Sequence, residues 1–132
     1  MTESIEVSVA VGVRAAVAAY AQALDAGRTD DLVELFTPDG VSDIAGIGVF
    51  EGREALRAAY AGFAPKRPQL HLVSNTVVTS WTESEVTAVS DLAFFLRGKS
   101  GWAVQAVGRY DDTLRLHEGV WRFQRRVTTF LP

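Results

Sequence analysis

Residues 70–81 read LHLVSNTVVTSW, and this stretch decides how the second half of the chain is interpreted. β-Branched and aromatic residues are enriched in it, which is typical of a strand. Three further stretches have the same character, at residues 85–97, 102–116 and 120–130. The polar and glycine-containing breaks between them are typical of hairpin turns. The second half of the chain therefore predicts four long strands in an antiparallel meander.

The residues before this meander predict helices. Apolar residues from position 13 to position 24 recur at spacings of four, three and four, which places one apolar stripe along a helix over residues 13–26. Gly27 fits a C-cap, and Thr29 fits the N-cap of a short second helix over residues 30–36. The expected order continues with a turn at residues 38–40, a short strand at 41–44, flexible glycines at 46 and 48, and a third helix over 53–63.

Helices followed by an antiparallel sheet predict an α+β fold. We expect a cone-shaped, curved antiparallel sheet with the three N-terminal helices packed on its concave face, in a single domain that spans residues 1–132. A chain of 132 residues is of ordinary size for one domain. Such a cone leaves a cavity unless large side chains fill it, so polar residues that point inward are the candidates for chemistry.

The composition excludes several kinds of site. The chain has no cysteine, which excludes disulfides, thiolate ligands and a cysteine nucleophile, and its two histidines are too few for a histidine-rich metal centre. The net charge is −3 and no Lys/Arg-rich run is present, which argues against a nucleic-acid partner. The acidic N-terminus and Arg14 within its apolar stretch predict neither a signal peptide nor a membrane span. We therefore expect a cytoplasmic protein that uses no metal and no cofactor.

His71 is the strongest candidate for catalysis. It lies among apolar neighbours in a predicted strand, and histidine is the side chain best suited to move protons near neutral pH. Asp43 lies in a short apolar segment where alternation could turn it inward, and a buried carboxylate must be paired or protonated. Paired with His71, Asp43 would fix the imidazole tautomer. The alternatives are a histidine that only satisfies a hydrogen bond and a surface aspartate that follows the turn at residues 38–40.

Tyr20 and Asp25 are two further catalytic candidates, in the second half of the first helix. Tyr20 lies on the apolar stripe, where a tyrosine is usually part of the core, but a hydroxyl that reached the cavity could donate to a carbonyl or an oxyanion. Asp25 lies five residues later, about 140° around an ideal helix from Tyr20. Both would face one cavity only if the helix frayed or bent near Gly27.

Other polar and aromatic residues are candidates for binding a ligand. Alternation in residues 102–116 places small residues beside Tyr110 and Asp112, which indicates a pocket wall rather than a packed core. In residues 120–130, alternation leaves two faces open, one that includes Arg126 and one that includes Phe123. The candidate substrate-binding residues are Phe36, Phe50, Tyr60, Asn75, Tyr110, Asp112 and Arg126.

Several short motifs run through both halves of the chain. The helical half carries YAQALDAG at residues 20–27, LFTPD at 35–39 and FEGREAL at 50–56, and the strand half carries HLVSN at 71–75, GRYDD at 108–112 and GVWRFQRR at 119–126. With these motifs the chain resembles the SnoaL-like branch of the nuclear-transport-factor-2-like superfamily, over about residues 10–130. The resemblance implies a cone-shaped α+β fold. Enzymes and non-catalytic binders share this fold, so it implies less about function.

Within this superfamily the chain is similar to two dehydratases. Asp43 and His71 fall where scytalone dehydratase has its catalytic carboxylate and the histidine paired with it, and Tyr20 falls on a tyrosine of that enzyme. Its second catalytic histidine would fall near Leu96 and is missing here. The tyrosine, aspartate and histidine of bile-acid 7α-dehydratase match Tyr20, Asp25 and His71. The resemblance therefore implies that His71 has a carboxylate partner and leaves Asp43 and Asp25 as alternatives.

Ketosteroid isomerase is similar at Tyr20 and, less closely, at Asp112, where it has oxyanion-hole donors, but its general base falls at Ile44. The leading hypothesis is a small cofactor-free lyase or isomerase with dehydratase-like acid–base chemistry on a hydrophobic, carbonyl-bearing small molecule. In this hypothesis His71 is the base and Tyr20 binds the developing enolate. The alternatives are a non-catalytic protein that binds a hydrophobic ligand and a polyketide cyclase of the SnoaL type.

The resemblance also implies a homodimer that forms through the open face of the sheet. Phe95, Trp81 and the outward face of residues 102–116 would supply apolar area for this contact. We expect a hydrophobic small molecule as the ligand, and neither nucleic acid nor membrane as a partner.

Overall fold

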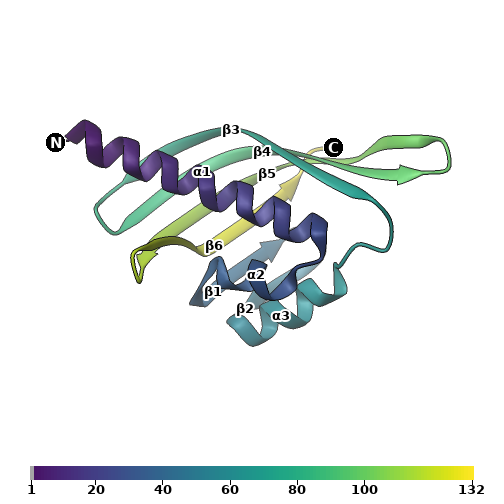
Figure 1. Ribbon diagram of the computed structural model, residues 1–132, viewed down its shortest axis with the longest axis horizontal. Helices are drawn as coiled ribbons and strands as arrows, with labels where there is room; N and C mark the ends of the chain where they lie inside the picture. Colours follow the sequence, from purple (N-terminus) through teal and green to yellow (C-terminus); the bar gives the residue numbers. More distant parts are fainter. Residues whose placement is uncertain (1) are drawn as a thin grey trace.

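The computed structural model describes the backbone of residues 2–132 and the side chains from residue 6 onward. Figure 1 shows how the chain runs through its helices and strands. In order, the elements are α1 (Thr2–Ala26), α2 (Thr29–Glu34), β1 (Phe36–Ile44), β2 (Gly48–Glu51), α3 (Arg53–Gly62), β3 (Gln69–Trp81), β4 (Glu85–Gly98), β5 (Gly101–His117) and β6 (Val120–Phe130).

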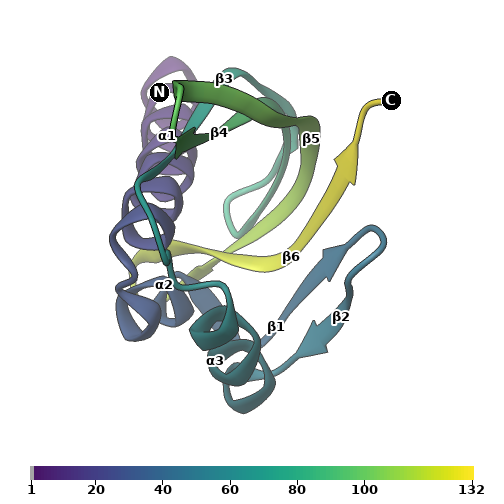
Figure 2. The same ribbon diagram turned by 90° about the vertical axis from the view of Figure 1, so that its right-hand side faces the viewer.

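The strands form one curved, unclosed sheet in the order β2-β1-β6-β5-β4-β3. Strands β3 to β6 pair antiparallel in sequence, which confirms the predicted meander and the α+β fold class. Figure 2 shows the sheet curling around one side of the molecule while α1 lies across the open side of the curl. The concave side of the sheet and the inner faces of the helices therefore enclose the interior of the protein.

The helices agree with the prediction in kind but not at their ends. α1 begins well before its predicted start, because Val9 continues the buried stripe toward the N-terminus, and Gly27 follows its end with a positive φ of 70°. The prediction that Thr29 is an N-cap is wrong, since Arg28 takes the cap position of α2 and no side chain caps the helix. α2 also stops before Phe36, which begins β1.

The segment Glu6–Ala26 is long and apolar enough to cross a membrane by length and composition, with a mean hydropathy of 1.5. Its buried stripe, which includes Val13, Val17 and Tyr20, instead packs into the core of this protein. A core helix of a soluble protein passes the same test of length and composition. α1 is therefore only weak evidence for a membrane span.

The segment after α2 is a strand where the sequence predicts a turn. Residues 38–40 lie inside β1, which pairs antiparallel with β2 and parallel with β6. The register between β1 and β6 shifts between Phe36 and Val41, and this irregularity tolerates Pro38 in a strand. Of the two glycines expected to be flexible, Gly48 begins β2 and Gly46 lies in the turn before it. Pairing with β6 at Phe36 and again from Val41 thus carries the strand across residues 38–40, where the register shifts.

A β-bulge in β6 decides which residues of the last strand face inward. The pairing of β6 with β5 skips Gln124, and the extra residue shifts the alternation by one position. Phe123 is buried before the bulge, and Arg126 and Thr128 are buried after it. Neither of the two faces predicted for this strand is therefore inward along its whole length.

Apolar side chains remain on the outer face of the sheet. Leu70 on β3, Phe95 on β4 and Val104 on β5 are register neighbours in one row across the sheet. Leu70 and Val104 are both exposed. Trp81, expected to extend this face, packs against the core instead.

Candidate active site

His71 and Asp25 form a hydrogen-bonded pair between β3 and the end of α1. Nδ1 of His71 lies 2.6 Å from Oδ1 of Asp25, and the backbone N–H of His71 donates to Oδ2 at 2.6 Å. Gln69, two residues earlier in β3, donates from Nε2 to Oδ1 at 3.0 Å. The side chains of His71 and Asp25 are 11% and 13% exposed, so water reaches little of the pair. One carboxylate thereby fixes both the ring and the backbone of the histidine.

The hydrogen bonds around Asp25 keep this carboxyl ionised. Burial by itself raises the pKa of Asp25, but the donors from the ring and backbone of His71 and from Gln69 lower the pKa overall. An ionised carboxylate accepts a hydrogen bond from Nδ1, so the neutral imidazole carries its proton there and presents a free lone pair on Nε2. This is the arrangement of a general base and the residue that orients it.

Phe94 holds the plane of the imidazole. It is the register partner of His71 on β4. The two rings are stacked, with centroids 4.4 Å apart and planes 18° apart. Such cross-strand pairs stabilise sheets, and here the pair also limits rotation of the histidine ring.

His71 also lines an apolar cavity of about 260 Å³. Both helices α1 and α3 and the concave face of the sheet contribute to its wall, which consists of Tyr20, Leu24, Ile44, Ile47, Tyr60, Phe63, Gln69, His71, Leu92, Phe94, Tyr110, Thr128 and Phe130. None of these thirteen side chains is Lys, Arg, Asp or Glu. Ile47 and Phe130 are about half exposed and mark the mouth of the cavity. Asp25 is not part of the wall, because it binds His71 from behind.

Three hydroxyls form a buried chain beside the cavity. The Tyr20 hydroxyl lies 2.5 Å from that of Tyr60, which in turn lies 2.8 Å from the Ser42 hydroxyl. Burial raises the pKa of both tyrosines, so they are protonated donors at neutral pH. The chain fixes the positions of the two phenol rings in the wall of the cavity.

A buried ion pair supports the aromatic wall from below. Arg126 binds Asp112 through two hydrogen bonds, of 2.8 Å from Nε and 3.1 Å from one terminal nitrogen, and both side chains are fully buried. The guanidinium carbon lies 4.3 Å from the ring centroid of Tyr20 and 3.5 Å from that of Tyr110. Arg126 and Asp112, predicted to bind substrate, therefore lie beneath the tyrosines and not among the residues that line the cavity.

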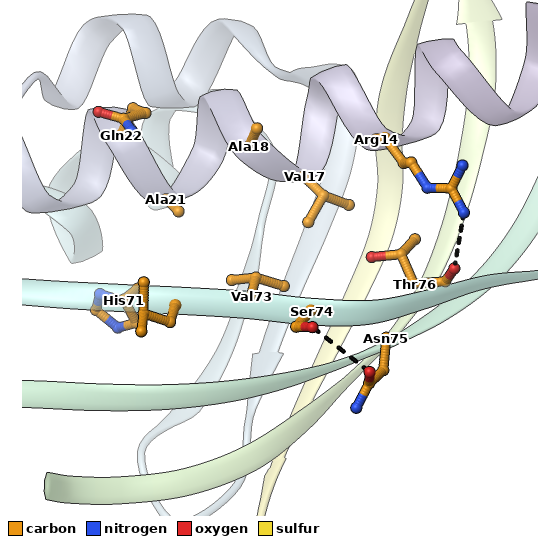
Figure 3. Close-up of a pocket in the computed structure, with 11 residues that line it drawn as sticks. Arg14, Val17, Ala18, Ala21, Gln22, His71, Val73, Ser74, Asn75 and Thr76 are labelled. Atoms are coloured by element: carbon orange, nitrogen blue, oxygen red, sulfur yellow. Dashed lines mark hydrogen bonds between the residues drawn. The ribbon is translucent and has the colours of Figure 1, made fainter.

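A second depression lies outside the cavity, as an open groove between α1 and β3 (Figure 3). Its volume is about 490 Å³, and its wall includes Arg14 from α1 and residues 71–76 of β3. His71 borders both this groove and the inner cavity. The candidate Asn75 also lines the groove, where its backbone has a positive φ of 56° and its side chain donates to Asp91 at 3.0 Å.

Asp43 does not pair with His71. It lies on β1 between Ser42 and Ile44, which are both buried, so alternation turns Asp43 toward the outer face of the sheet. There it forms an ion pair with Arg125, whose terminal nitrogen lies 2.8 Å from the carboxylate. Of the two carboxylates left open as partners of His71, the structure brings Asp25 to it.

The remaining predicted residues divide into two groups. Tyr20, Tyr60 and Tyr110 line the cavity. Phe36 is fully buried in the core, and Phe50 packs edge-on against Phe63 with ring centroids 6.3 Å apart. Neither of these two phenylalanines lines the cavity.

Sequence reasoning missed two polar residues of the site, Gln69 and Thr128. Gln69 could have been found by alternation, because it lies two residues before His71 and shares its face of β3. Thr128 could not be placed, since the bulge at Gln124 decides its face. Among residues 6–132, no group of three or more acidic, histidine or cysteine side chains could hold a metal ion.

The family model of the SnoaL-like domain matches residues 6–127. The chain belongs to the SnoaL-like domain family. Its fold is accordingly that of the nuclear-transport-factor-2-like superfamily, as the sequence motifs imply. No curated protein matches the sequence.

Solved structures of the same fold include proteins with different descriptions. A variant of a protein of unknown function from Mycobacterium tuberculosis has a TM-score of 0.90 and 22% identity, over 98% of this chain and 75% of that one. A proposed scytalone dehydratase from Novosphingobium aromaticivorans has a TM-score of 0.88 and 22% identity, over 100% and 89%. LinA has a TM-score of 0.85 and 19% identity, over 100% and 92%. At these identities the likeness shows the fold alone.

Proposed function

We propose that this SnoaL-like domain is a cofactor-free lyase or isomerase that acts in the cytoplasm on a hydrophobic, carbonyl-bearing small molecule. The observation that carries the proposal is the 2.6 Å contact between Nδ1 of His71 and the carboxylate of Asp25, at the wall of an uncharged cavity. A histidine with a packing role alone needs no ionised partner. The pair, by contrast, is what a general base requires.

The chemistry that fits this pair is a β-elimination. Nε2 of His71 takes a proton from the carbon next to the carbonyl, and the C–H electrons form an enolate. The enolate electrons then form a carbon–carbon double bond as the hydroxyl on the next carbon leaves. The imidazolium returns the proton to that hydroxyl, so the products are the unsaturated carbonyl compound and water. Asp25 stabilises the imidazolium between the two proton transfers.

The small, apolar cavity supports this chemistry in two ways. Its lining excludes water from the enolate, and its lack of formal charge strengthens the hydrogen bonds made inside it. Tyr20, proposed as a donor to the enolate, lines the cavity but shares its hydroxyl with Tyr60. Its proton is available to a ligand only when Ser42 donates to Tyr60 and Tyr60 donates to Tyr20.

The proposal is tested by dehydration of 3-hydroxy-1-tetralone, a bicyclic β-hydroxyketone whose loss of water and tautomerisation give 1-naphthol. Wild-type protein should accelerate the appearance of naphthol absorbance. His71→Gln should lower the rate by a factor of about 10² to 10⁴, which is the usual contribution of a general base. His117→Gln is the matched control, because His117 is the last residue of β5 and does not line the cavity, and it should retain the wild-type rate.

Two other results would redirect the proposal. Tight binding of the ketone without turnover, unchanged in His71→Gln, would favour a non-catalytic ligand-binding protein. Carbon–carbon bond formation with an open-chain polyketone, dependent on His71, would favour a cyclase that uses the same base.

A further inference from the structure

Tyr110 and Thr128 lie opposite each other on β5 and β6. They are direct register partners, so their side chains leave the sheet side by side on its concave face. The two residues are 3% and 5% exposed, and both line the same cavity as His71. A phenol and a threonine hydroxyl therefore stand together in a wall that is otherwise mainly hydrocarbon.

Both hydroxyls lack a partner within the part of the chain that the structure describes. The hydroxyls of Tyr20 and Tyr60 are hydrogen-bonded to each other, and that of Tyr60 also to Ser42, whereas no hydrogen bond to the hydroxyl of Tyr110 or Thr128 is found among residues 6–132. The fully enclosed polar side-chain atoms without a partner are nitrogens of Arg53, Arg122 and Arg126, and neither hydroxyl is among them. The two hydroxyls therefore keep access to the space of the cavity. Each hydroxyl is therefore free to form a hydrogen bond with an oxygen of a ligand in the cavity.

Tyr110 also lies within electrostatic range of the catalytic pair. Burial raises the pKa of this phenol, and the charge of Asp25 adds to that rise. The Tyr110 hydroxyl thus stays protonated, and it lines the same cavity as His71. By contrast, the Tyr20 hydroxyl is engaged by Tyr60 at 2.5 Å.

We infer that the hydroxyls of Tyr110 and Thr128 bind an oxygen of the ligand, and that the ligand is a small uncharged ring compound with one such oxygen near the carbon that faces His71. The inference rests on the proposed function for the position of that carbon. The volume of about 260 Å³ lies at the small end of ligand pockets. Since no Lys or Arg lines the cavity and the proposed base is a neutral imidazole, a carboxylate or phosphate inside it would be unpaired. Ligands that would place an anionic group inside the cavity are therefore excluded.

Binding of 2-tetralone and of tetralin, its hydrocarbon counterpart, tests the inference by ligand-observed NMR. Wild-type protein should prefer the ketone. Tyr110→Phe and Thr128→Val each remove one hydroxyl with little change of shape, and each should reduce the preference by roughly fivefold while tetralin still binds. Thr129→Val is the matched control, because Thr129 is exposed on the next position of β6, and it should keep the wild-type preference.

Three results would overturn the inference. The first is a wild-type protein that binds neither compound or shows no preference for the ketone. The second is a preference that survives in both Tyr110→Phe and Thr128→Val. The third is a preference that Tyr20→Phe alone removes, because the oxygen would then be bound by the tyrosine chain. Tight binding of 2-naphthoate would contradict the uncharged class of ligand.

The same titrations separate this inference from the proposed function. His71→Gln should keep the preference for 2-tetralone over tetralin, because the histidine is not the proposed oxygen ligand. A protein that shows the preference but catalyses no dehydration would refute the proposed function and leave the oxygen site in place. If wild-type protein catalyses dehydration, and Tyr110→Phe and Thr128→Val change neither the rate nor the preference for the ketone, the oxygen site is refuted and the proposed function stands.

Discussion

At the scale of single residues, Asp25 should make the stability of the protein depend on pH. Its folded-state pKa lies below the ordinary value of 3.8, so the folded chain releases this proton more readily than the unfolded chain does. The carboxylate therefore stabilises the fold fully above the unfolded-state pKa, and this stabilisation is lost as the pH falls through the folded-state pKa. The free energy of unfolding of the wild type should exceed that of Asp25→Asn at about pH 5, and the difference should shrink at about pH 3.

Urea denaturation at the two pH values measures this difference. A gap between wild type and Asp25→Asn that stays the same at both values would contradict the assignment. The sign is decisive, since a carboxyl whose pKa were raised by burial would stabilise the fold more at the lower pH.

The buried pair of Arg126 and Asp112 predicts a large loss of stability when one partner is removed. One terminal nitrogen of Arg126 already lacks a partner, so Asp112→Asn would leave the buried guanidinium without its compensating charge. We expect a loss of about 3–5 kcal/mol in the free energy of unfolding. Asp111→Asn is the matched control, because Asp111 is exposed on the next position of β5, and its effect should be small. Similar effects of the two substitutions in thermal or urea unfolding would argue against the pair.

Residue types predicted part of the site, but contacts between elements completed it. His71 stood out because a histidine in an apolar strand is unusual, and both Asp25 and Asp43 were candidates for its partner. α1 continues as a helix through Asp25, so no fraying is needed to bring Tyr20 and Asp25 to the same site. Asp25 binds His71, and His71 and Tyr20 line the same cavity. The sequence around Tyr20 and Asp25 does not reveal that His71, 46 residues after Asp25, lies beside that carboxylate.

At the scale of the elements, β5 and β6 meet closely at Gly108. A Cβ added there would lie 2.4 Å from the carbonyl oxygen of Thr129, so the two strands would have to separate. Gly108→Ala should lower the free energy of unfolding by about 1–3 kcal/mol, as overpacking does. Gly98→Ala is the matched control, since a Cβ at Gly98 meets nothing within 4 Å and its effect should be small. Equal thermal midpoints for the two variants would contradict this close approach.

The strands were predictable where β-branched and aromatic residues continue over a long stretch between clear turn signals. The bounds of β3 to β6 differ from the predicted strands by at most one residue at either end. The failures lie where pairing decides the conformation. β1 runs through Pro38 and Gly40 at a register shift, with pairing to β6 on either side of them at Phe36 and Val41, and the inward face of β6 changes at Gln124. A single-residue bulge leaves no recognisable mark in the alternation pattern.

At the scale of the whole molecule, the outer row of Leu70, Phe95 and Val104 leads us to propose a dimer formed by two copies of this face. Phe95→Asp places a charge at the centre of the row and should convert a dimer to a monomer in light scattering. Val49→Asp is the control, because Val49 is exposed on β2 at the other edge of the sheet, away from this row. A dimer mass retained in Phe95→Asp would reject this face as the interface.

The overall shape was predictable because the order of helices and strands admits few packings. A curled sheet closed by α1 creates the cavity, and its volume depends on side chains that meet only in the folded state. The proposed function rests in addition on the position of His71, which is paired with Asp25 and lines this cavity. Fold similarity alone would serve a binder as well as an enzyme.

The measurement that tests the central claim most directly is hydrogen–deuterium exchange at the carbon next to the carbonyl of 2-tetralone, followed by proton NMR in D₂O. This exchange requires only the general base and no leaving group. Wild-type protein should accelerate it, and His71→Gln should lower the protein-catalysed rate by a factor of about 10² or more. Asp25→Asn should give an intermediate rate. Equal exchange rates with wild type, His71→Gln and no protein would contradict the claim that the Asp25–His71 pair is a working base.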